Sequence, residues 1–446
     1  MLHRRSAVGL WLAALCIVVA GCGGSHLSSL PNGDRALQPQ LNGGGGNLAL
    51  PTLYVSGQGA VYAYDLSATP SPDATPVSKT TGYYYQVGGA EGLNASIAGI
   101  ATNSTGDLVI AQNFFSPQGD GNSCQLVYIP ARTGTKAANA TSTTCSNAVG
   151  GHTTGVAVGV TFTGDRTVRQ IAFTSARVDA LPVSNIQIST PTPSPSPSPT
   201  PTGAPFANDV DVLMHYISSG NPNVRACDGS TIDQYEVDRY QAISNGQGGG
   251  TIAARTCLTL DQGTTSQYNA IAGSTNGAFF VDYTGGPTIT AAARRPASIL
   301  VGPPSTSDTI ERFNANGGAP SNVGTVPGAG PLAVAAELTT NIGYRVVAST
   351  TSGVTTIYSF HVSNSSGLTF DHALGTFTNP VGALAVDNRG TIFVGVNQPN
   401  GVTKIKVYAK TKTEATNPDY VLNNPVRRPN PSAAPAAVIT GIAIAQ

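Results

Sequence analysis

The sequence predicts an all-β fold, a β-propeller with six four-stranded blades favoured over seven. Three observations predict this fold: a strand motif that recurs along the chain, turn residues between alternating apolar runs, and two chain ends that complete each other. The 446 residues include 52 Gly and 31 Pro. After the N-terminal segment no long stretch carries a helical period, so strands have little competition.

Residues 381–410 are the clearest copy of the repeated unit. They read VGALAV, a turn at 388–390, the run IFVGV, a turn at 399–401, and then TKIKVYA. Alternating apolar residues bounded by Asn, Gly and Pro are typical of half-buried antiparallel strands joined by tight hairpins. One such ribbon cannot bury its own apolar face, so we expect several copies to pack together.

The first strand of this unit recurs as a small residue, then Ile, Val or Leu, then Ala. Its central residues are Ile100, Val156, Ile271, Leu332, Leu384 and Ile442. Most intervals between them are roughly 50 to 60 residues, which a four-stranded blade with its loops requires. Small residues suit this strand because the innermost strands of a propeller crowd around its axis.

The interval between Val156 and Ile271 is about twice as long as the others and contains a Pro/Ser/Thr run at about 190–205. Such a run cannot donate a sheet ladder and prefers an extended polyproline form, so we expect a disordered insertion. Either the run is a surface excursion inside an oversized third blade, or a degenerate extra blade lies between Phe206 and Leu260. The first interpretation gives six blades and is favoured.

The two ends of the chain complement each other. Residues 53–65 resemble the second and third strands of the unit without a first strand, and residues 440–446 are a first strand with nothing after it. A ring of sheets closes when its last segment pairs into its first sheet and removes the exposed edges. We therefore expect residues 51–446 to form one propeller domain.

The N-terminus is typical of a targeting segment. Residues 3–5 are basic and residues 7–19 are apolar. The tetrapeptide VAGC at 19–22 resembles the lipobox of bacterial lipoproteins. That resemblance implies that residues 1–21 are a signal peptide, that Cys22 carries the lipid, and that Cys16 is removed. An ordinary cleaved secretory signal is the alternative.

Residues 22–50 follow as a Gly-rich tether, for which a flexible chain predicts an end-to-end distance on the order of 30 Å. In Gram-negative lipoproteins, Gly rather than Asp after the lipid-bearing cysteine indicates sorting to the outer membrane. The lipobox resemblance thus makes the membrane the expected partner and the outer membrane or cell surface the expected location.

The four remaining cysteines predict disulfides, because an even number in an exported protein favours pairing. Four cysteines allow three connectivities. The sequential pairing, Cys124 with Cys145 and Cys227 with Cys257, closes the shortest loops and is favoured. No C-x-x-C spacing occurs, so neither zinc binding nor redox catalysis is indicated.

Charge argues against nucleic acid as a partner. The chain has 23 basic and 23 acidic residues, and only 10% of its residues are charged. A polyanion needs a basic face, and none is evident. We expect a monomer without a cofactor.

The phrase ALAVDNRGTIFVGV, followed by TKIKVY, resembles an NHL-type propeller repeat. NHL-like and gluconolactonase-like propellers usually have six blades. Some bind protein or RNA, and others are metal-dependent lactonases or lyases with ligands around the axial channel. For such an enzyme the resemblance implies a Glu, an Asn and an Asp as metal ligands, and Glu91, Asn103 and Asp387 are weak candidates. Asn and Asp at these positions also serve as turn residues that bond their own backbone.

Other catalytic patterns are absent, including G-x-S-x-G, H-E-x-x-H and the phosphate-binding loop. The histidines at 26, 152, 215, 361 and 372 are scattered, which indicates surface or packing roles. The acidic segment 209–238 lacks the spacing of a calcium loop and predicts a solvated acidic face. Tyrosines 83–85 are either a recognition patch or simply strand formers.

The favoured function is therefore a binding or scaffolding module of the cell envelope, and a metal-dependent lactonase or lyase is the alternative.

Overall fold

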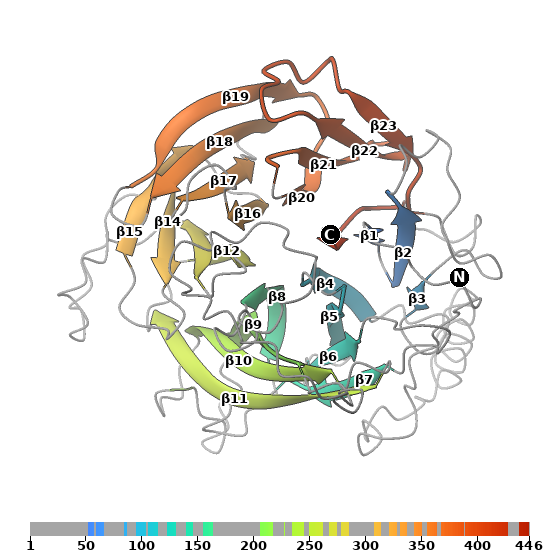
Figure 1. The fold of residues 1–446 in the computed structure, drawn as a ribbon, viewed down its shortest axis with the longest axis vertical. Helices are drawn as coiled ribbons and strands as arrows, with labels where there is room; N and C mark the ends of the chain where they lie inside the picture. Colours follow the sequence, from blue (N-terminus) through green and yellow to red (C-terminus); the bar gives the residue numbers. More distant parts are fainter. Residues whose placement is uncertain are drawn as a thin grey trace, which may run out of the picture. The chain divides into compact units, whose positions relative to one another are not determined.

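The structure, a computed structural model, consists of antiparallel sheets set around a common axis (Figure 1). It describes residues 52–57, 59–66, 84–86, 95–103, 106–114, 123–130, 140–145, 155–163, 206–216, 227, 234–244, 249–261, 267–273, 278–284, 307–313, 321–327, 331–336, 343–349, 355–363, 367–387, 389–426 and 437–445. No helix long and apolar enough to cross a membrane occurs among these residues. The predicted signal peptide, Cys22 and the tether lie outside them.

The described strands form six sheets of four strands, here called blades 1 to 6, which confirms the predicted fold class. Each blade is given from its inner to its outer strand. Blade 1 is β24 (Gly441–Ala445), β1 (Thr52–Ser56), β2 (Ala60–Asp65) and β3 (Tyr85–Gln86). Blade 2 is β4 (Ala95–Thr102), β5 (Leu108–Phe114), β6 (Ser123–Ile129) and β7 (Thr141–Thr144). Blade 3 is β8 (Gly155–Thr163), β9 (Phe206–Tyr216), β10 (Gln234–Ser244) and β11 (Gly250–Asp261).

The other three blades continue the ring. Blade 4 is β12 (Gln267–Gly273), β13 (Phe279–Thr284), β14 (Ser307–Phe313) and β15 (Ser321–Pro327). Blade 5 is β16 (Leu332–Ala336), β17 (Gly343–Ser349), β18 (Thr355–Ser363) and β19 (Thr369–Phe377). Blade 6 is β20 (Val381–Val386), β21 (Ile392–Asn397), β22 (Thr403–Tyr408) and β23 (Tyr420–Asn423).

The recurrent first-strand motif forms the inner strand of every blade, and each inner strand contacts the inner strands of the two neighbouring blades. Their small residues permit this approach. A Cβ at Gly441 would lie 3.1 Å from Ile100 Cγ1 of blade 2, and one at Gly99 would lie 3.3 Å from the Val160 nitrogen of blade 3. The sequence motif therefore records the crowding of strands around the axis.

Blade 1 closes the ring by joining the two ends of the chain. Strand β24 pairs antiparallel with β1, with Ile442 opposite Val55. The Thr440 amide donates to the Ser56 carbonyl at 2.9 Å, and the two hydroxyls lie 3.0 Å apart. The predicted closure is confirmed.

The doubled interval is explained by blade 3, whose strands β9, β10 and β11 are each 11 or 12 residues long. Residues 164–205, which include the Pro/Ser/Thr run, separate them from β8 and lie outside the described residues. Among the described residues, no extra blade lies between β8 and β12. The six-bladed interpretation is correct because β8, β9, β10 and β11 form one sheet.

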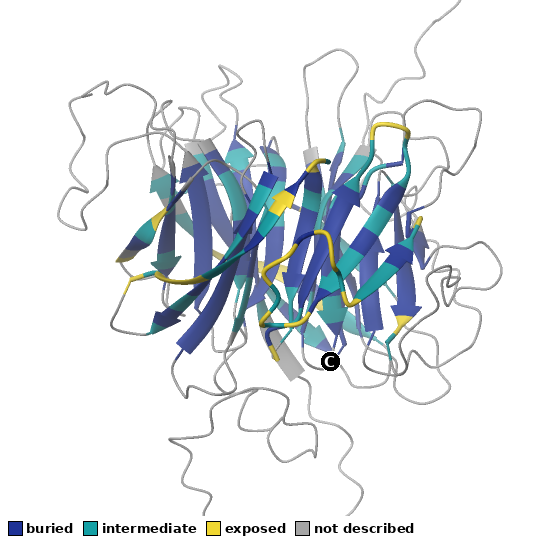
Figure 2. Ribbon diagram, turned by 90° about the horizontal axis from the view of Figure 1, so that it is seen from above, coloured by how far each residue is buried: buried dark blue, intermediate teal, exposed yellow. Residues whose placement is uncertain are grey.

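Apolar side chains fill the space between neighbouring blades, so most described strand residues are buried (Figure 2). Between blades 4 and 5, for example, Phe280 and Ile310 pack with Tyr344 and Val346. Each blade is thus buried on both faces, which removes the need for helices to cover the sheets.

Candidate functional site

The described inner strands offer no carboxylate, imidazole or thiolate ligand for a metal ion. In the six described inner strands, every side chain is apolar or a neutral Ser, Thr, Tyr, Asn or Gln, without Asp, Glu, His, Cys, Lys or Arg. Hard divalent ions prefer carboxylate oxygens, and softer ones prefer imidazole or thiolate. These strands therefore do not fit the metal centre that a lactonase-like propeller would need.

Two of the weak metal candidates serve as turn residues at equivalent places in two blades. Asn103 Oδ1 accepts a hydrogen bond from the Asp107 amide at 2.9 Å. Asp387 Oδ1 accepts from the Arg389 amide at 2.9 Å and the Thr391 amide at 2.7 Å. Each closes the turn between the first and second strands. The third candidate, Glu91, lies outside the described residues, so we derive no metal-dependent step.

The acidic segment of blade 3 is not a solvated face, and that prediction was wrong. Asp211, Glu236 and Asp238 are at most 1% exposed, while the acids at 228 and 233 lie outside the described residues. Asp211 binds the guanidinium of Arg239 through both oxygens, at 2.7 and 2.9 Å. Arg239 is its direct partner across β9 and β10. Strand pairing therefore takes these charges into the interior instead of leaving them in water.

A second pair of buried acids lies in blade 4. Asp282 of β13 and Asp308 of β14 are both 0% exposed. Asp282 is opposite Ile310, so Asp308 is its diagonal neighbour on the same face of the sheet. Burial, followed by the charge of Asp308, raises the pKa of Asp282 to about 9. Among the described residues, Asp282 has no donor except the carboxyl of Asp308, with which it can share a proton.

Side chains of blade 5 form the candidate functional site. We call Arg345, Ser359, His361, Asp371 and His372 the blade-5 cluster. Arg345 Nη1 donates to Ser359 Oγ at 2.6 Å and to Asp371 Oδ2 at 2.7 Å. The other carboxylate oxygen of Asp371 lies 3.5 Å from His361 Nε2, and His372 Nδ1 lies 2.9 Å from Oδ2. His361 of β18 and His372 of β19 thus both contact the carboxylate of Asp371.

A β-bulge assembles this cluster. His372 is opposite Ser359 and Phe370 is opposite Phe360, so Asp371 is an extra residue without a cross-strand partner. A bulge breaks the alternation of side chains and re-aims them. Asp371 can therefore bind the guanidinium of Arg345 while its neighbour His372 contacts the Asp371 carboxylate, an arrangement that a regular strand would prevent.

The cluster joins a buried cation to a more exposed carboxylate. Arg345 is 2% exposed, whereas Asp371 is 31% and His361 is 38% exposed. Burial acts to raise the pKa of Asp371, but hydrogen bonds from Arg345 and His372 outweigh it and lower the pKa to about 2. The cluster consequently presents a fixed carboxylate and an accessible imidazole to solvent.

An exposed aromatic ring lies beside the cluster in the same strand. Phe370 is 58% exposed and is the one large hydrophobic residue in the described part of the chain with an exposed side chain. Its ring centroid lies 6.0 Å from that of Phe360 and 6.4 Å from that of Tyr358. These two rings contact Phe370 edge-on and leave more than half of its surface exposed.

The tyrosine triplet is not a recognition patch in the described residues. Tyr84 is 5% exposed and Tyr85 is 1% exposed, while Tyr83 lies outside the described residues. Tyr85 donates to Gln112 Oε1 at 2.9 Å. Strand packing therefore explains these residues, and His215 likewise stacks on Tyr235 with centroids 4.3 Å apart.

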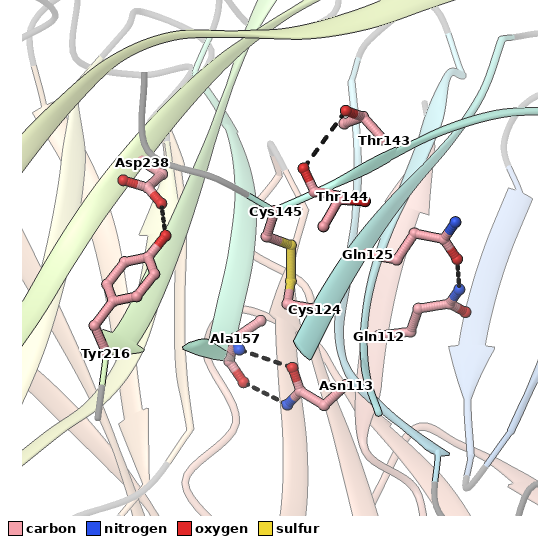
Figure 3. Close-up of a disulfide and its surroundings, with 10 residues drawn as sticks. All are labelled: Gln112, Asn113, Cys124, Gln125, Thr143, Thr144, Cys145, Ala157, Tyr216 and Asp238. Carbon is pink, nitrogen blue, oxygen red and sulfur yellow. Dashed lines mark hydrogen bonds between the residues drawn. A yellow bond between two sulfur atoms is a disulfide. The ribbon is translucent and has the colours of Figure 1, made fainter. Parts of the chain in front are cut away.

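The four cysteines form the two sequential disulfides that the loop lengths favoured. Figure 3 shows Cys124 bonded to Cys145, both 1% exposed, beside the contact that joins blades 2 and 3. In that contact, Asn113 donates to the Ala157 carbonyl at 2.8 Å and accepts from its amide at 2.7 Å. This disulfide therefore braces the interior of the ring, whereas Cys227 and Cys257 are half-buried on blade 3.

No protein-family model and no curated protein matches the chain. Among solved structures, it is similar to AztD from Citrobacter koseri, with 10% identity, a TM-score of 0.34, and coverage of 88% of this chain and 97% of that chain. It is also similar to AofleA from Arthrobotrys oligospora, with 11% identity, a TM-score of 0.35, and coverage of 71% and 68%.

A third similar structure is the gluconolactonase XC5397 from Xanthomonas campestris. It has 13% identity and a TM-score of 0.23, over 39% of this chain and 55% of that one. Overlaps this loose carry no argument about function. The chain is thus placed by its own strand topology, as a six-bladed β-propeller.

Proposed function

We propose that the chain is a lipid-anchored propeller of a bacterial cell envelope that binds a protein partner through the outer edge of blade 5. The observation that carries this proposal is Phe370, a large aromatic side chain that is 58% exposed in a strand flanked by charged groups. An exposed aromatic centre with a polar rim is the usual composition of a protein interface.

The neighbouring groups define how such a partner would bind. Strand β19 is the outermost strand of blade 5, and among the described residues no further strand pairs with it. The bulge at Asp371 interrupts that edge, and bulges hinder the addition of another strand. A partner would therefore contact side chains, with an apolar group on Phe370 and a hydrogen-bond donor on Asp371.

The lipid anchor rests on the sequence of the N-terminal segment. The VAGC tetrapeptide resembles a lipobox, Cys22 would carry the lipid, and the Gly-rich residues after it would act as a tether. The propeller would be held near the membrane, in the outer membrane or at the cell surface, while the blade edge stays free to meet a partner.

Site-specific photocrosslinking in intact cells tests the binding surface. A photoreactive amino acid at Phe370 should yield a discrete crosslinked protein. The same probe at Thr376, exposed near the other end of β19, is the matched control. Crosslinking that is equal at both positions, or absent at Phe370, would refute the proposed surface.

The anchor is tested separately. Wild-type chain should incorporate labelled palmitate and fractionate with membranes, and a Cys22→Ser variant should do neither. Continued labelling of that variant would contradict the lipid assignment, and it would leave the interpretation of the blade-5 crosslink intact.

A further inference from the structure

The second disulfide lies against a buried carboxylate. The two sulfurs of Cys227 and Cys257 and a carboxylate oxygen of Glu236 all lie within 4.8 Å of one another. Glu236 is 0% exposed, and its Oε1 accepts a hydrogen bond from the Cys227 amide at 2.6 Å. That bond holds the carboxylate beside the disulfide, so three groups able to bind a metal already converge on one place.

Asp238 borders this group. It is the direct cross-strand partner of Cys257, so both side chains project from the same face of β10 and β11. Asp238 is 1% exposed, and one of its oxygens accepts the hydroxyl of Tyr216 (Figure 3). It is not one of the three residues whose ligand atoms converge, so it lines the group without belonging to it.

We propose that reduction of the Cys227–Cys257 disulfide opens a zinc site made by Cys227, Cys257 and Glu236. Two thiolates and one carboxylate, with a water in the fourth position, form a tetrahedral donor set of the kind that Zn²⁺ accepts, with distances of about 2.3 Å to sulfur and about 2.0 Å to oxygen. The Cα atoms of the two cysteines are 5.8 Å apart. Rotation of the cysteine side chains can therefore separate the sulfurs around one ion.

The reaction requires a reductant, and a dithiol protein or a phosphine can serve. A dithiol transfers two electrons and two protons to the disulfide, which becomes two thiols while the dithiol becomes a disulfide. A phosphine does the same with one water and becomes the phosphine oxide. Zinc binding then releases the two thiol protons, because the metal ligand is the thiolate.

The other disulfide provides an internal contrast. Cys124 and Cys145 are both 1% exposed, whereas Cys227 and Cys257 are half-buried and more open to a reductant and to metal. Within the described residues, the Cys227, Glu236 and Cys257 group is also the one set of three such side chains close enough to share an ion. Reduction should therefore begin at Cys227–Cys257, and metal should bind there.

The test uses the whole exported chain and a graded phosphine reductant. Mild reduction should release two thiols, assigned by alkylation and peptide mapping to Cys227 and Cys257. Adding Co²⁺ should then produce thiolate-to-cobalt charge-transfer absorption with one ion per chain, and Zn²⁺ should displace it. Zn²⁺ should also protect the same two cysteines from alkylation, which requires no variant.

A Glu236→Gln variant keeps an oxygen for the Cys227 amide but removes the anionic ligand, and it should weaken Co²⁺ binding at least about tenfold. Glu414→Gln, at an exposed acid of blade 6, should leave binding unchanged. The proposal is overturned if the reduced wild-type chain shows two free thiols at these positions and no charge-transfer band. Protection mapped to Cys124 and Cys145 would overturn it as well.

Discussion

Replacing Asp282 by Asn should stabilise the protein at neutral pH. The carboxyl is 0% exposed and lies beside the equally buried Asp308, so the folded chain holds a proton on this pair. Asn has nearly the same shape and presents an N–H group to Asp308 without having to take up a proton. The charge of the pair at neutral pH is therefore the same before and after the substitution.

The magnitude follows from the pKa of Asp282, which burial raises from 3.8 to about 9. The folded state binds the proton more tightly than the unfolded state. The contribution of this proton to the stability of the wild-type chain is therefore fully present below pH 4 and is lost as pH rises toward 9. At pH 7 the loss amounts to roughly 4 kcal/mol as an upper limit, at about 1.4 kcal/mol per pH unit. For a domain of this size, that corresponds to a Tm increase of about 5 °C in Asp282→Asn.

Denaturant and calorimetric unfolding of both chains at pH 4, 5.5, 7 and 8.5 measures this difference. We expect equal stability near pH 4 and a gap in favour of Asp282→Asn that widens with pH. A variant that is no more stable at pH 7, with a gap that does not change with pH, would refute the assignment of a shared proton to this pair.

Three further predictions concern the ring and the blade-5 cluster. Ile442→Ala removes an apolar group from the closing strand β24 and should lower the free energy of unfolding by about 2–5 kcal/mol in urea. Gly390→Ala should destabilise by about 1–2 kcal/mol, because φ is 84° and the new Cβ would lie 3.1 Å from Arg345 Nε. Gly59→Ala, with nothing within 4 Å, should stay within about 0.5 kcal/mol of wild type. Hydrogen bonds from Arg345 and His372 lower the pKa of Asp371, so the ionised carboxylate stabilises the wild-type fold above pH 4, and this contribution is lost as pH falls from 4 to 2. Asp371→Asn should lack this contribution at every pH. Acid titration of both chains, followed by circular dichroism, measures the difference.

The ring was predictable because its signal is local and repeated. Each inner strand carries the same small-residue motif, and Gly441 shows the reason, since a side chain there would press on Ile100 of the next blade. The turn role of Asp387 was also readable, because Asn and Asp bond their own backbone within a few residues. Such features depend on short stretches of chain.

The candidate site could not be predicted in this way, because its contacts cross strands. The pairing of Asp211 with Arg239 follows from the register of β9 and β10, and no local pattern indicates which acid will meet a base. His361 and His372 converge only because of the bulge at Asp371, which alternation in the sequence does not reveal. The approach of Glu236 to Cys257 likewise depends on register.

The pairing of β24 with β1 has a consequence for how the protein reaches its folded state. Ser56 and Thr440 touch although 384 positions separate them. A contact of such long range forms late, because the entropy cost of closing a very long loop must be met before the contact can stabilise the chain. Blade 1 therefore stays unfinished during synthesis until the last strand emerges.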